Sequence, residues 1–266
     1  MKLSLKAYLL SSLIFTPFVM ANDLPTGAEI AEKINARDDG ISVSRLLTME
    51  LIDRRGKKRV RETRGFRKYY DDEKRTVIHY LKPRNVKRTA FMTFDYPQAK
   101  RDDDQWLYLP ALRKVRRISA SDRGDYFLGT DYTYEDIKKE NKVSVEDYHR
   151  KTLRKELLDG FPVFVVESTP INNEIAKELG YSKVVRWVDE KIWMIRKSEF
   201  WDVQGNPLKT TYSKDIRKVQ GIWTAHRLEA ENKKTGHKTI FIFSDVDYKK
   251  EVSDDLFTER ALRRGL

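Results

Sequence analysis

Residues 104–119 read DQWLYLPALRKVRRIS, and this stretch combines the two patterns that recur along the chain. Its first half alternates Trp106 and Tyr108 with two leucines, so a strand over 106–109 carries large apolar side chains on both faces. Rings beside clustered charge fit a surface that binds single-stranded RNA, but they also fit one wall strand of a larger sheet. Pro110 ends the strand, and four cations follow on the next turn and strand: Arg113, Lys114, Arg116 and Arg117.

The double-sided pattern is repeated in other segments, whereas a single antiparallel sheet facing water alternates strictly between apolar and polar residues. Both faces of the sheet therefore need cover. One solution is a two-layer core, with helices on one side and sheet on the other. The other is a curved sheet whose concave face encloses a hydrophobic cavity, and the scarcity of helical residues favours it. The segments are TVIHYL (76–81), TAFMTF (89–94), WLYLP (106–110), KVVRWV (183–188), KIWMIRKSEFW (191–201) and KTIFIF (238–243).

Period-two patterns and turn signals predict a meander of antiparallel strands. Asp159-Gly160, Gly205-Asn206-Pro207 and Thr235-Gly236 are sequences typical of hairpin turns. A chain of this length can fold as one large β domain. The strands are expected at 47–51, 77–81, 90–94, 106–109, 153–158, 162–168, 182–188, 192–201, 207–213, 222–231 and 237–244.

Three segments have helical patterns. The first begins at a capping box formed by Thr26 and Glu29 and ends at an Asp-Asp-Gly sequence. The others are expected near 133–149, where a second capping pair starts at Ser144, and near 172–180. The predicted fold class is thus mainly β (α+β).

The N-terminus predicts export. Residues 1–21 contain a cationic head, an apolar run from Ala7 to Val19 and a small residue, Ala21, at the cleavage position. An uncleaved membrane anchor is the alternative, but the run is shorter than the roughly 20 residues that span a bilayer, and Pro17 interrupts it. We therefore expect a signal peptide over 1–21 and a single mature domain over 22–266, located in the periplasm. The chain has no cysteine, so we expect neither a disulfide nor an acyl anchor.

The formal net charge of +12 is concentrated in two stretches, 53–68 and 113–123. One interpretation is that Lys and Arg protect exposed strand edges and turns. The other is a strongly basic face that meets an anionic membrane or an acidic partner. Export makes nucleic acid an unsuitable partner, so RNA binding fits the residue types of 104–119 but not the compartment.

Motifs of common enzymes and metal sites are absent from the sequence. There is no G-x-S-x-G elbow, no H-E-x-x-H helix and no G-x-x-x-x-G-K loop. The four histidines are scattered without ligand spacing, and we expect His226 to be a hydrogen-bonded structural residue. The acidic run 102–104 lacks the other residues of a calcium loop and is expected to be an exposed turn. We predict no catalytic residue, no metal site and no cofactor.

Three stretches together resemble one protein family: 104–119, GTDYTYEDI at 129–137 and VVESTP at 165–170. In an exported chain without cysteine, they look like the outer membrane lipoprotein-sorting protein family, whose members are distant relatives of the periplasmic carrier LolA. The resemblance implies an incomplete β-barrel of about eleven antiparallel strands around a hydrophobic cavity, with a few helices as a lid. It also implies carriage of lipid or lipoprotein acyl chains between the inner and outer membranes. An inner-membrane transporter of the resistance-nodulation-division (RND) type and an outer-membrane acceptor are the partners it suggests.

The hypothesis from the sequence is thus a non-enzymatic, monomeric periplasmic carrier with transient membrane contact. A non-carrying docking module of an envelope transporter complex, with a filled two-layer core, is the alternative, and a hydrolase without a recognisable motif is a third. The expected docking residues are the four cations Arg113, Lys114, Arg116 and Arg117. The expected cavity-wall residues are Met49, Leu51, Phe66, Phe91, Phe94, Trp106, Tyr108, Trp187, Trp193 and Trp223.

Overall fold

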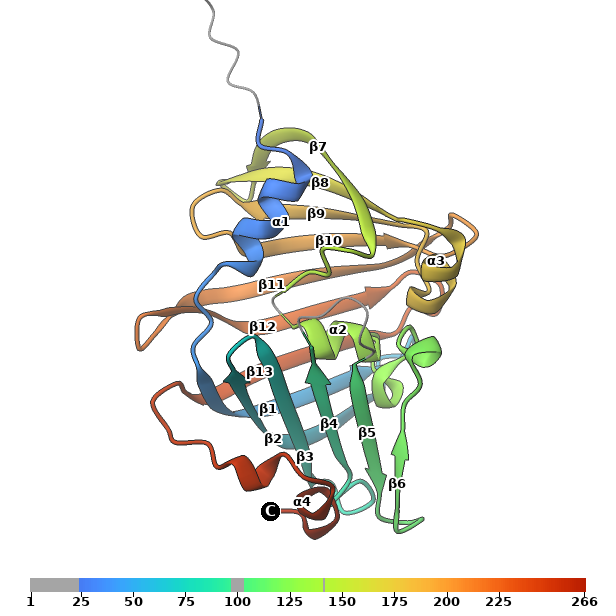
Figure 1. Ribbon diagram of the computed structural model, residues 1–266. Coiled ribbons are helices and arrows are strands. Elements are labelled where there is room, and N and C mark those ends of the chain that lie inside the picture. Colours follow the sequence, from blue (N-terminus) through green and yellow to red (C-terminus); the bar gives the residue numbers. More distant parts are fainter. Residues whose placement is uncertain (1–23, 97–102, 141) are drawn as a thin grey trace, which may run out of the picture.

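The chain forms one curved antiparallel sheet of thirteen strands (Figure 1). The computed structural model describes residues 24–96, 103–140 and 142–266, so the expected signal peptide over 1–21 lies outside the described residues. The strands are β1 (Ser42–Ile52), β2 (Lys58–Tyr70), β3 (Glu73–Lys82), β4 (Ala90–Asp95), β5 (Asp104–Leu109), β6 (Lys114–Arg117), β7 (Tyr148–Leu158), β8 (Phe161–Pro170), β9 (Lys183–Asp189), β10 (Ile195–Trp201), β11 (Pro207–Val219), β12 (Ile222–Asn232) and β13 (Lys238–Asp247).

The strand order shows how the sheet is assembled from two meanders. Going across the sheet, the order is β6-β5-β4-β3-β2-β1-β13-β12-β11-β10-β9-β8-β7. The first and last strands of the sequence, β1 and β13, pair in the middle, where Met49 lies opposite Phe241. The two edges of the sheet, β6 and β7, do not pair with each other, so the barrel is open. The predicted incomplete barrel is confirmed, with thirteen strands in place of about eleven.

Local signals in the sequence explain most of the turns and the first helix. In α1 (Gly27–Asn35), Thr26 and Glu29 form the predicted capping box, in which the Glu29 carboxylate accepts the Thr26 N–H at 2.7 Å. Between β7 and β8, Asp159 and Gly160 have φ values of 50° and 81°, as a two-residue hairpin turn with positive φ requires. The predicted helix near 172–180 is α3 (Asn173–Leu179).

Two predictions about local structure were wrong. Strand β2 was not predicted, because cations occupy so many of its positions that the apolar period is hidden. The helix expected over 133–149 shortens to α2 (Tyr134–Lys139), since β7 begins at Tyr148 and needs an extended chain. The Ser144 hydroxyl still accepts the N–H of Asp147 at 3.3 Å, but no helix follows it.

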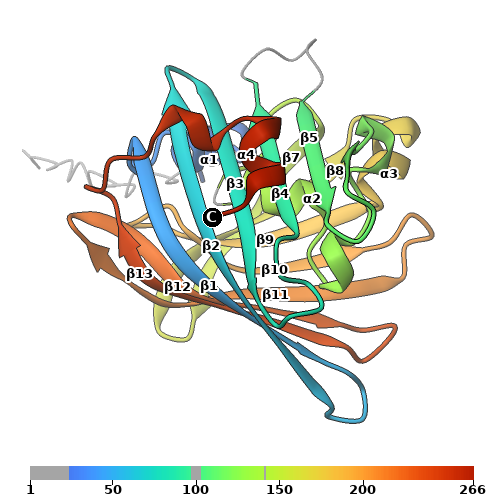
Figure 2. The same ribbon diagram turned by 90° about the horizontal axis from the view of Figure 1, so that it is seen from below.

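The two faces of the sheet are covered by different parts of the chain (Figures 1 and 2). Helices α1 and α2 lie over the concave face, while the C-terminal segment with α4 (Glu259–Arg264) packs on the opposite face of β3 to β5. Neighbouring residues divide accordingly: Val77 contacts the C-terminal cluster with Phe257, and Ile78 belongs to the concave cluster. Both faces of these strands are buried, as their sequence predicted.

The concave face is covered mainly by residues 127–140, which we call the plug segment. The fully buried Phe127 meets Phe91 of β4 with ring centroids 5.1 Å apart, and Tyr132 stacks on Phe241 of β13 at 4.7 Å. Apart from α2 and the short 3-10 turn Phe127–Gly129, the plug segment is irregular chain. From the sequence, the scarcity of helical residues favoured a cavity on the concave face. In the structure, irregular chain covers much of that face instead.

A buried histidine lies between β3 and the C-terminal segment. His79 is 2% exposed and points to the same face as Val77, which α4 covers. Neither of its ring nitrogens has a hydrogen-bond partner among the described residues. Burial, with a smaller contribution from the charge of Arg264, lowers the pKa of His79 to about 4.

We predict that His79 makes the protein less stable in acid. Unfolding returns its pKa to about 6.5, so the unfolded chain binds more protons than the folded chain between pH 6.5 and pH 4. The free energy of unfolding should therefore fall by about 3 kcal/mol over this range because of His79 alone. In urea titrations at several pH values, the free energy of unfolding of His79→Phe should fall less steeply with decreasing pH than that of the wild-type protein. His149→Phe is the control, since His149 is exposed. If both variants changed the pH dependence of the free energy of unfolding equally, the prediction would be contradicted.

Candidate functional site

A cavity of about 170 Å³ lies between the plug segment and the concave face of the sheet. The plug segment contributes Tyr132 and Ile137 to the apolar lining of the cavity, and the strands contribute most of the other apolar residues. Val143, Leu179, Tyr181 and Met194 come from α3 and from loops. The apolar strand residues that line it include Leu47, Ile78, Phe200, Leu228, Phe241 and Phe243. The cavity is therefore a space inside the fold, bounded by sheet on one side and by irregular chain on the other.

Small side chains on the second half of the sheet create this space. In β3 and β4 the concave positions carry Ile78 and Phe91, which reach the plug segment. In β10 to β12 the lining includes five small side chains beside the larger Phe200, Tyr212 and Leu228: Ser198, Thr211, Ser213, Thr224 and Ala225. The small side chains leave the space between the larger ones unfilled, and the cavity forms there.

The cavity as it stands is too small for a whole acyl chain. Pockets for drug-sized ligands run from about 300 to 1,000 Å³, and an apolar cavity of about 150 Å³ holds only benzene. A space of about 170 Å³ therefore accommodates one end of a chain, and a longer ligand requires the plug segment to move outward.

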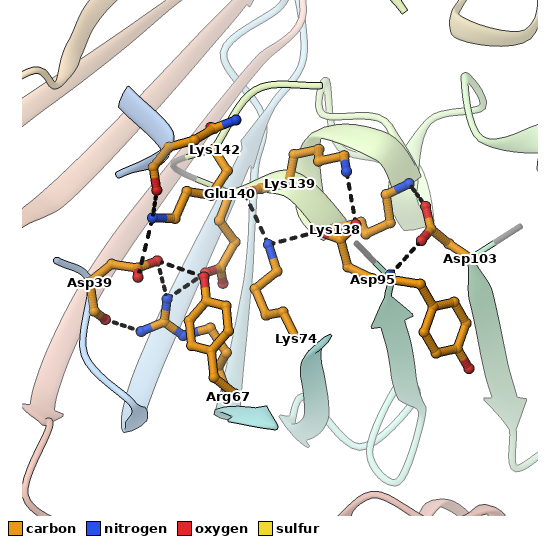
Figure 3. A network of polar contacts seen from close by, with 12 residues as sticks. Asp39, Arg67, Lys74, Asp95, Asp103, Lys138, Lys139, Glu140 and Lys142 are labelled. Atoms are coloured by element: carbon orange, nitrogen blue, oxygen red, sulfur yellow. Dashed lines mark hydrogen bonds and ion pairs between the residues drawn. The ribbon is translucent and has the colours of Figure 1, made fainter. Parts of the chain in front are cut away.

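Figure 3 shows that charged side chains tie the end of the plug segment to the first strands of the sheet. Lys139 Nζ lies 2.8 Å from Asp95 of β4, and Lys74 Nζ of β3 lies 3.2 Å from the same carboxylate. Lys138, with only 2% of its side chain exposed, pairs with Asp103 and with Glu135. Burial alone would raise the pKa of Asp95, but the charges of Lys74 and Lys139 outweigh it and hold the pKa well below its usual range.

A second group of charges lies where the plug segment meets β1 and β2 (Figure 3). Glu140 pairs with Arg45, and the buried Arg67 lies 2.5 Å from Asp39. Lys142 Nζ adds a contact of 3.5 Å with Asp39. Burial would raise the pKa of Glu140, but Arg45 and Arg67 lower it, so the carboxylate is ionised inside the fold.

A third tie connects the plug segment to β11 and β13. Lys209 is completely buried, and its Nζ lies 2.6 Å from Asp136 and 2.9 Å from the carbonyl oxygen of Asp131. The Asp131 carboxylate in turn lies 2.6 Å from His237 Nδ1 and accepts the hydroxyl of Thr239 at 2.7 Å. Together, the three groups of ion pairs therefore join the plug segment to strands in both halves of the sheet.

On the other side of the plug segment, a polar cleft of about 830 Å³ opens between α1, β2 to β5 and the chain that leads to β7. Five residues line both the cleft and the cavity: Glu135, Lys139, Lys142, Val143 and Ser144. The α2 region is therefore a partition between the two spaces.

None of the ten residues expected at the cavity wall lines the cavity. Met49, Leu51 and Phe91 are on the concave face beneath the plug segment. Phe66, Phe94, Trp106 and Tyr108 lie on the opposite face of the sheet, packed with the C-terminal segment. Trp187 belongs to a separate cluster with Val163 and Val165, Trp193 stacks on Phe164 near α1, and Trp223 is half-buried with Lys218 over its ring. Contact of these ten side chains with cargo stays a prediction.

The four cations expected to dock a partner are all exposed on the turn and strand after β5. Arg117 pairs with Asp104, and Arg116 lies 3.8 Å from Asp122. Leu112 is 62% exposed beside them, at the β5–β6 turn. A docking role for these cations stays a prediction.

The remaining expectations concern the acidic run and His226. Asp104 begins β5, and Asp103 and Asp104 are half-buried in ion pairs, so the expected exposed turn is wrong for these two residues; position 102 lies outside the described residues. His226 is 5% exposed, and its Nδ1 lies 3.2 Å from the carbonyl oxygens of Asp215 and Thr224, in keeping with a structural role. In the described part of the chain, no group of three or more metal-ligating side chains could hold a metal ion. Within the same residues, no helix is long and apolar enough to cross a membrane.

Sequence reasoning missed the residues that close and line the cavity. Tyr132 and Asp136 lie in GTDYTYEDI, which was singled out only as part of a resemblance. Arg186 and the small residues of β10 to β12 had no distinctive local pattern. Their common property is that they line the cavity, which only the arrangement of the strands in space reveals.

The geometry defines a class: open, strongly curved antiparallel sheets with a cavity on the concave face. Among solved structures, an outer membrane lipoprotein-sorting protein domain from Vibrio parahaemolyticus is 31% identical, with a TM-score of 0.80 over 90% of this chain and 98% of that one. A DUF1329 family protein from Desulfovibrio piger is 27% identical, with a TM-score of 0.81 over 89% and 97% of the two chains. A LolA superfamily protein from Nitrosomonas europaea, 22% identical with a TM-score of 0.67 over 90% and 100%, shares the fold.

A family model described as an uncharacterized protein matches residues 72–264. A search of curated proteins found no match. The chain belongs to the family of outer membrane lipoprotein-sorting protein domains.

We predict that the buried tie at Lys209 is essential for closing the plug segment. Asp136→Asn should lower the free energy of unfolding by about 3 kcal/mol, because it leaves the buried ammonium group of Lys209 without a negative charge. Asparagine retains an oxygen for the N-terminal cap of α2, so the loss comes from the ion pair. The control is Glu229→Gln: Glu229 pairs with Lys214 and Arg227, both accessible at the surface, and its substitution should cost less than about 1 kcal/mol. Equal effects of the two variants in urea unfolding would contradict the prediction.

Proposed function

We propose that this protein is a periplasmic, non-enzymatic carrier that binds lipid or lipoprotein acyl chains on the concave face of its sheet. The observation that carries the proposal is the cavity between the plug segment and the small inward-facing residues of β10 to β12. The related chain from Vibrio parahaemolyticus is described as a lipoprotein-sorting domain, which supports a cargo with acyl chains.

The charged ties of the plug segment make its displacement feasible. An apolar plug exposes hydrophobic surface when it leaves, at about 25 cal/mol for each Å². Lys138, Glu140 and Lys209 instead recover their hydration when the segment moves outward, and buried ion pairs contribute little net stability relative to hydrated charges. An acyl chain that replaces Tyr132 and Phe127 on the sheet then covers the apolar surface that these rings leave.

The carrier would meet its membranes or transporter partners at the basic β5–β6 turn. Arg113 and Lys114 are exposed and form no ion pair within the described residues, and Leu112 projects beside them. Long-range attraction by such charges accelerates encounter with an anionic surface and adds little to the lifetime of the complex. An inner-membrane transporter of the RND type and an outer-membrane acceptor remain the proposed partners, and the proposed oligomeric state is a monomer.

A docking module that carries nothing is the second candidate. The observation that favours it is the plug segment itself, which fills most of the concave face with aromatic rings and leaves a residual space of about 170 Å³. The two candidates differ in whether the plug segment ever leaves the sheet.

Lipid binding is the test that separates them. Native mass spectrometry of the periplasmic protein, followed by solvent extraction, should reveal co-purified lipid. A brominated fatty acid should quench Trp193, which adjoins the lining residues Met194 and Ile195, so Trp193→Phe should remove part of the quenching. Trp187→Phe is the matched control, because Trp187 lies on the opposite face of the sheet from the cavity. No bound lipid and no quenching at saturating lipid would exclude the carrier and favour the docking module.

We predict that the basic turn controls association with membranes. Reversal of Arg113 and Lys114 to Glu should slow binding to anionic vesicles and flatten its dependence on salt, which screens charges over a Debye length of about 8 Å at physiological ionic strength. Fatty-acid binding by the isolated protein should remain unchanged, because these charges lie outside the cavity. Surface plasmon resonance on anionic and neutral vesicles measures the rates. Loss of fatty-acid binding in the folded variant, or unchanged association at low salt, would refute the docking role.

A further inference from the structure

Arg186 places a charge on the concave face of β9, between two buried valines. Strand alternation puts Val184, Arg186 and Val188 on one face, and Val184 and Val188 are completely buried there. Across the strand pairs, Arg186 lies opposite Val166 of β8 and Ser198 of β10. Both Arg186 and Ser198 line the cavity. A guanidinium group is therefore part of the wall of a cavity that also has apolar lining residues.

This guanidinium group has few partners of its own. Its recorded hydrogen bond is a long one of 3.3 Å from Nη1 to the hydroxyl of Ser168, although the group has five N–H donors. Among the ion pairs within the described residues, Arg186 takes part in none. It also lies over the ring of Tyr148, with its Cζ atom 5.7 Å from the ring centroid.

A second arginine lies close by and increases the local positive charge. The Arg150 Cζ atom is 5.5 Å from the same Tyr148 ring, and Arg150 donates to the carbonyl oxygens of Ser144, Val145 and Tyr148. Burial, and then the charge of Arg186, lower the pKa of Arg150 to about 10. The two guanidinium groups therefore repel each other in a partly desolvated place.

The nearby carboxylates are committed to other cations. Glu135, Asp136 and Asp147 act electrostatically on Tyr148. However, Glu135 pairs with Lys138, Asp136 with Lys209 and Asp147 with Arg123. The other cations of the cavity also have acidic neighbours, since Arg45 pairs with Glu140, Lys142 with Asp39 and Lys139 with Asp95.

Arg37 is the remaining cation of the lining. It forms no ion pair within the described residues either, but the charge of Asp39 acts on it. Arg186 thus faces the cavity without an ion pair to any described residue, and its hydrogen bond to Ser168 leaves most of its N–H donors free to bind a ligand.

We propose that the cargo is an anionic amphiphile, whose acyl chain lies in the cavity and whose carboxylate or phosphate head is bound by Arg186. This inference rests on the carrier function proposed above and narrows its cargo from acyl chains in general to lipids with an anionic oxygen head. A guanidinium group matches the geometry of carboxylate and phosphate oxygens, and a hydrogen bond between charged groups is stronger than one between neutral groups. An anion at this place would also relieve the repulsion between Arg186 and Arg150.

The test compares three probes with the same acyl chain on the full mature protein: decanoate, decanoyl lysophosphatidic acid and monodecanoylglycerol. Isothermal titration calorimetry should give an affinity for at least one anionic probe about tenfold or more above that for the neutral one, as expected for a charged hydrogen bond. Arg186→Gln should reduce anionic binding by the same factor and leave neutral binding unchanged, and Arg186→Lys should restore part of it. Tighter binding of decanoyl lysophosphatidic acid would point to a phospholipid cargo. Tighter binding of decanoate would point to a free fatty acid.

Arg154→Gln is the control, since Arg154 is exposed on β7 and pairs with Glu156. Equal affinities of the wild-type protein for anionic and neutral probes would overturn the anionic cargo and leave the carrier intact. Absence of binding for all three probes would overturn the carrier function as well. The wild-type comparison needs no variant, so a failure of Arg186→Gln to fold does not remove the test.

Discussion

The need to cover an apolar concave face governs the rest of this structure. A thirteen-stranded sheet with β6 and β7 as free edges curves without closing, so its inner surface cannot be buried by pairing alone. Phe91 and Phe241 provide apolar surface that must meet either protein or ligand. The plug segment meets this need with Phe127, Tyr132 and Tyr134, three rings on a chain that is mostly irregular. The backbone N–H groups of the plug segment bond mainly within residues 123–140, so its attachment to the strands depends on polar side-chain partners.

Those partners are charges, and their position explains why the cover can be both ordered and removable. Lys138, Lys209 and Glu140 are nearly or completely buried, and each has an opposite charge on a strand or within the plug segment. Inside the fold these pairs specify one arrangement, since leaving a single partner buried alone costs several kcal/mol. Outside it, water replaces the partners. An apolar cargo can then compete for the sheet with three rings, and the charged residues do not oppose it strongly.

The sequence predicted the architecture better than the site, for reasons that follow from the range of the interactions. Strand 106–109, the capping box at Thr26 and the Asp159-Gly160 turn depend on neighbouring residues, so their patterns are visible locally. Strand β2 was hidden by cations that line its exposed positions. The family resemblance supplied the open barrel, and the doubly apolar strands supplied the reason for cover on both faces.

The cavity residues were hidden because facing inward is a property of the register. Trp106 and Tyr108 are as large and apolar as any wall residue, yet they face the C-terminal segment. In KVVRWV, nothing distinguishes Arg186 from the exposed cations of other strands, yet it faces the concave side. A single sequence gives the alternation of a strand but does not tell which of its two faces is concave.

The two halves of the sheet therefore have different tasks. In β1 to β5, large inward-facing residues such as Met49 and Phe91 hold the rings of the plug segment, and the C-terminal segment backs the opposite face. In β8 to β12, small and polar residues lie among larger ones on the inner side, and Arg186 has unused hydrogen-bond capacity beside the remaining space. A ligand that is apolar along its length and anionic at one end matches this half of the sheet, because its chain would fill the remaining space and its head would bind the N–H donors of Arg186 that Ser168 does not use.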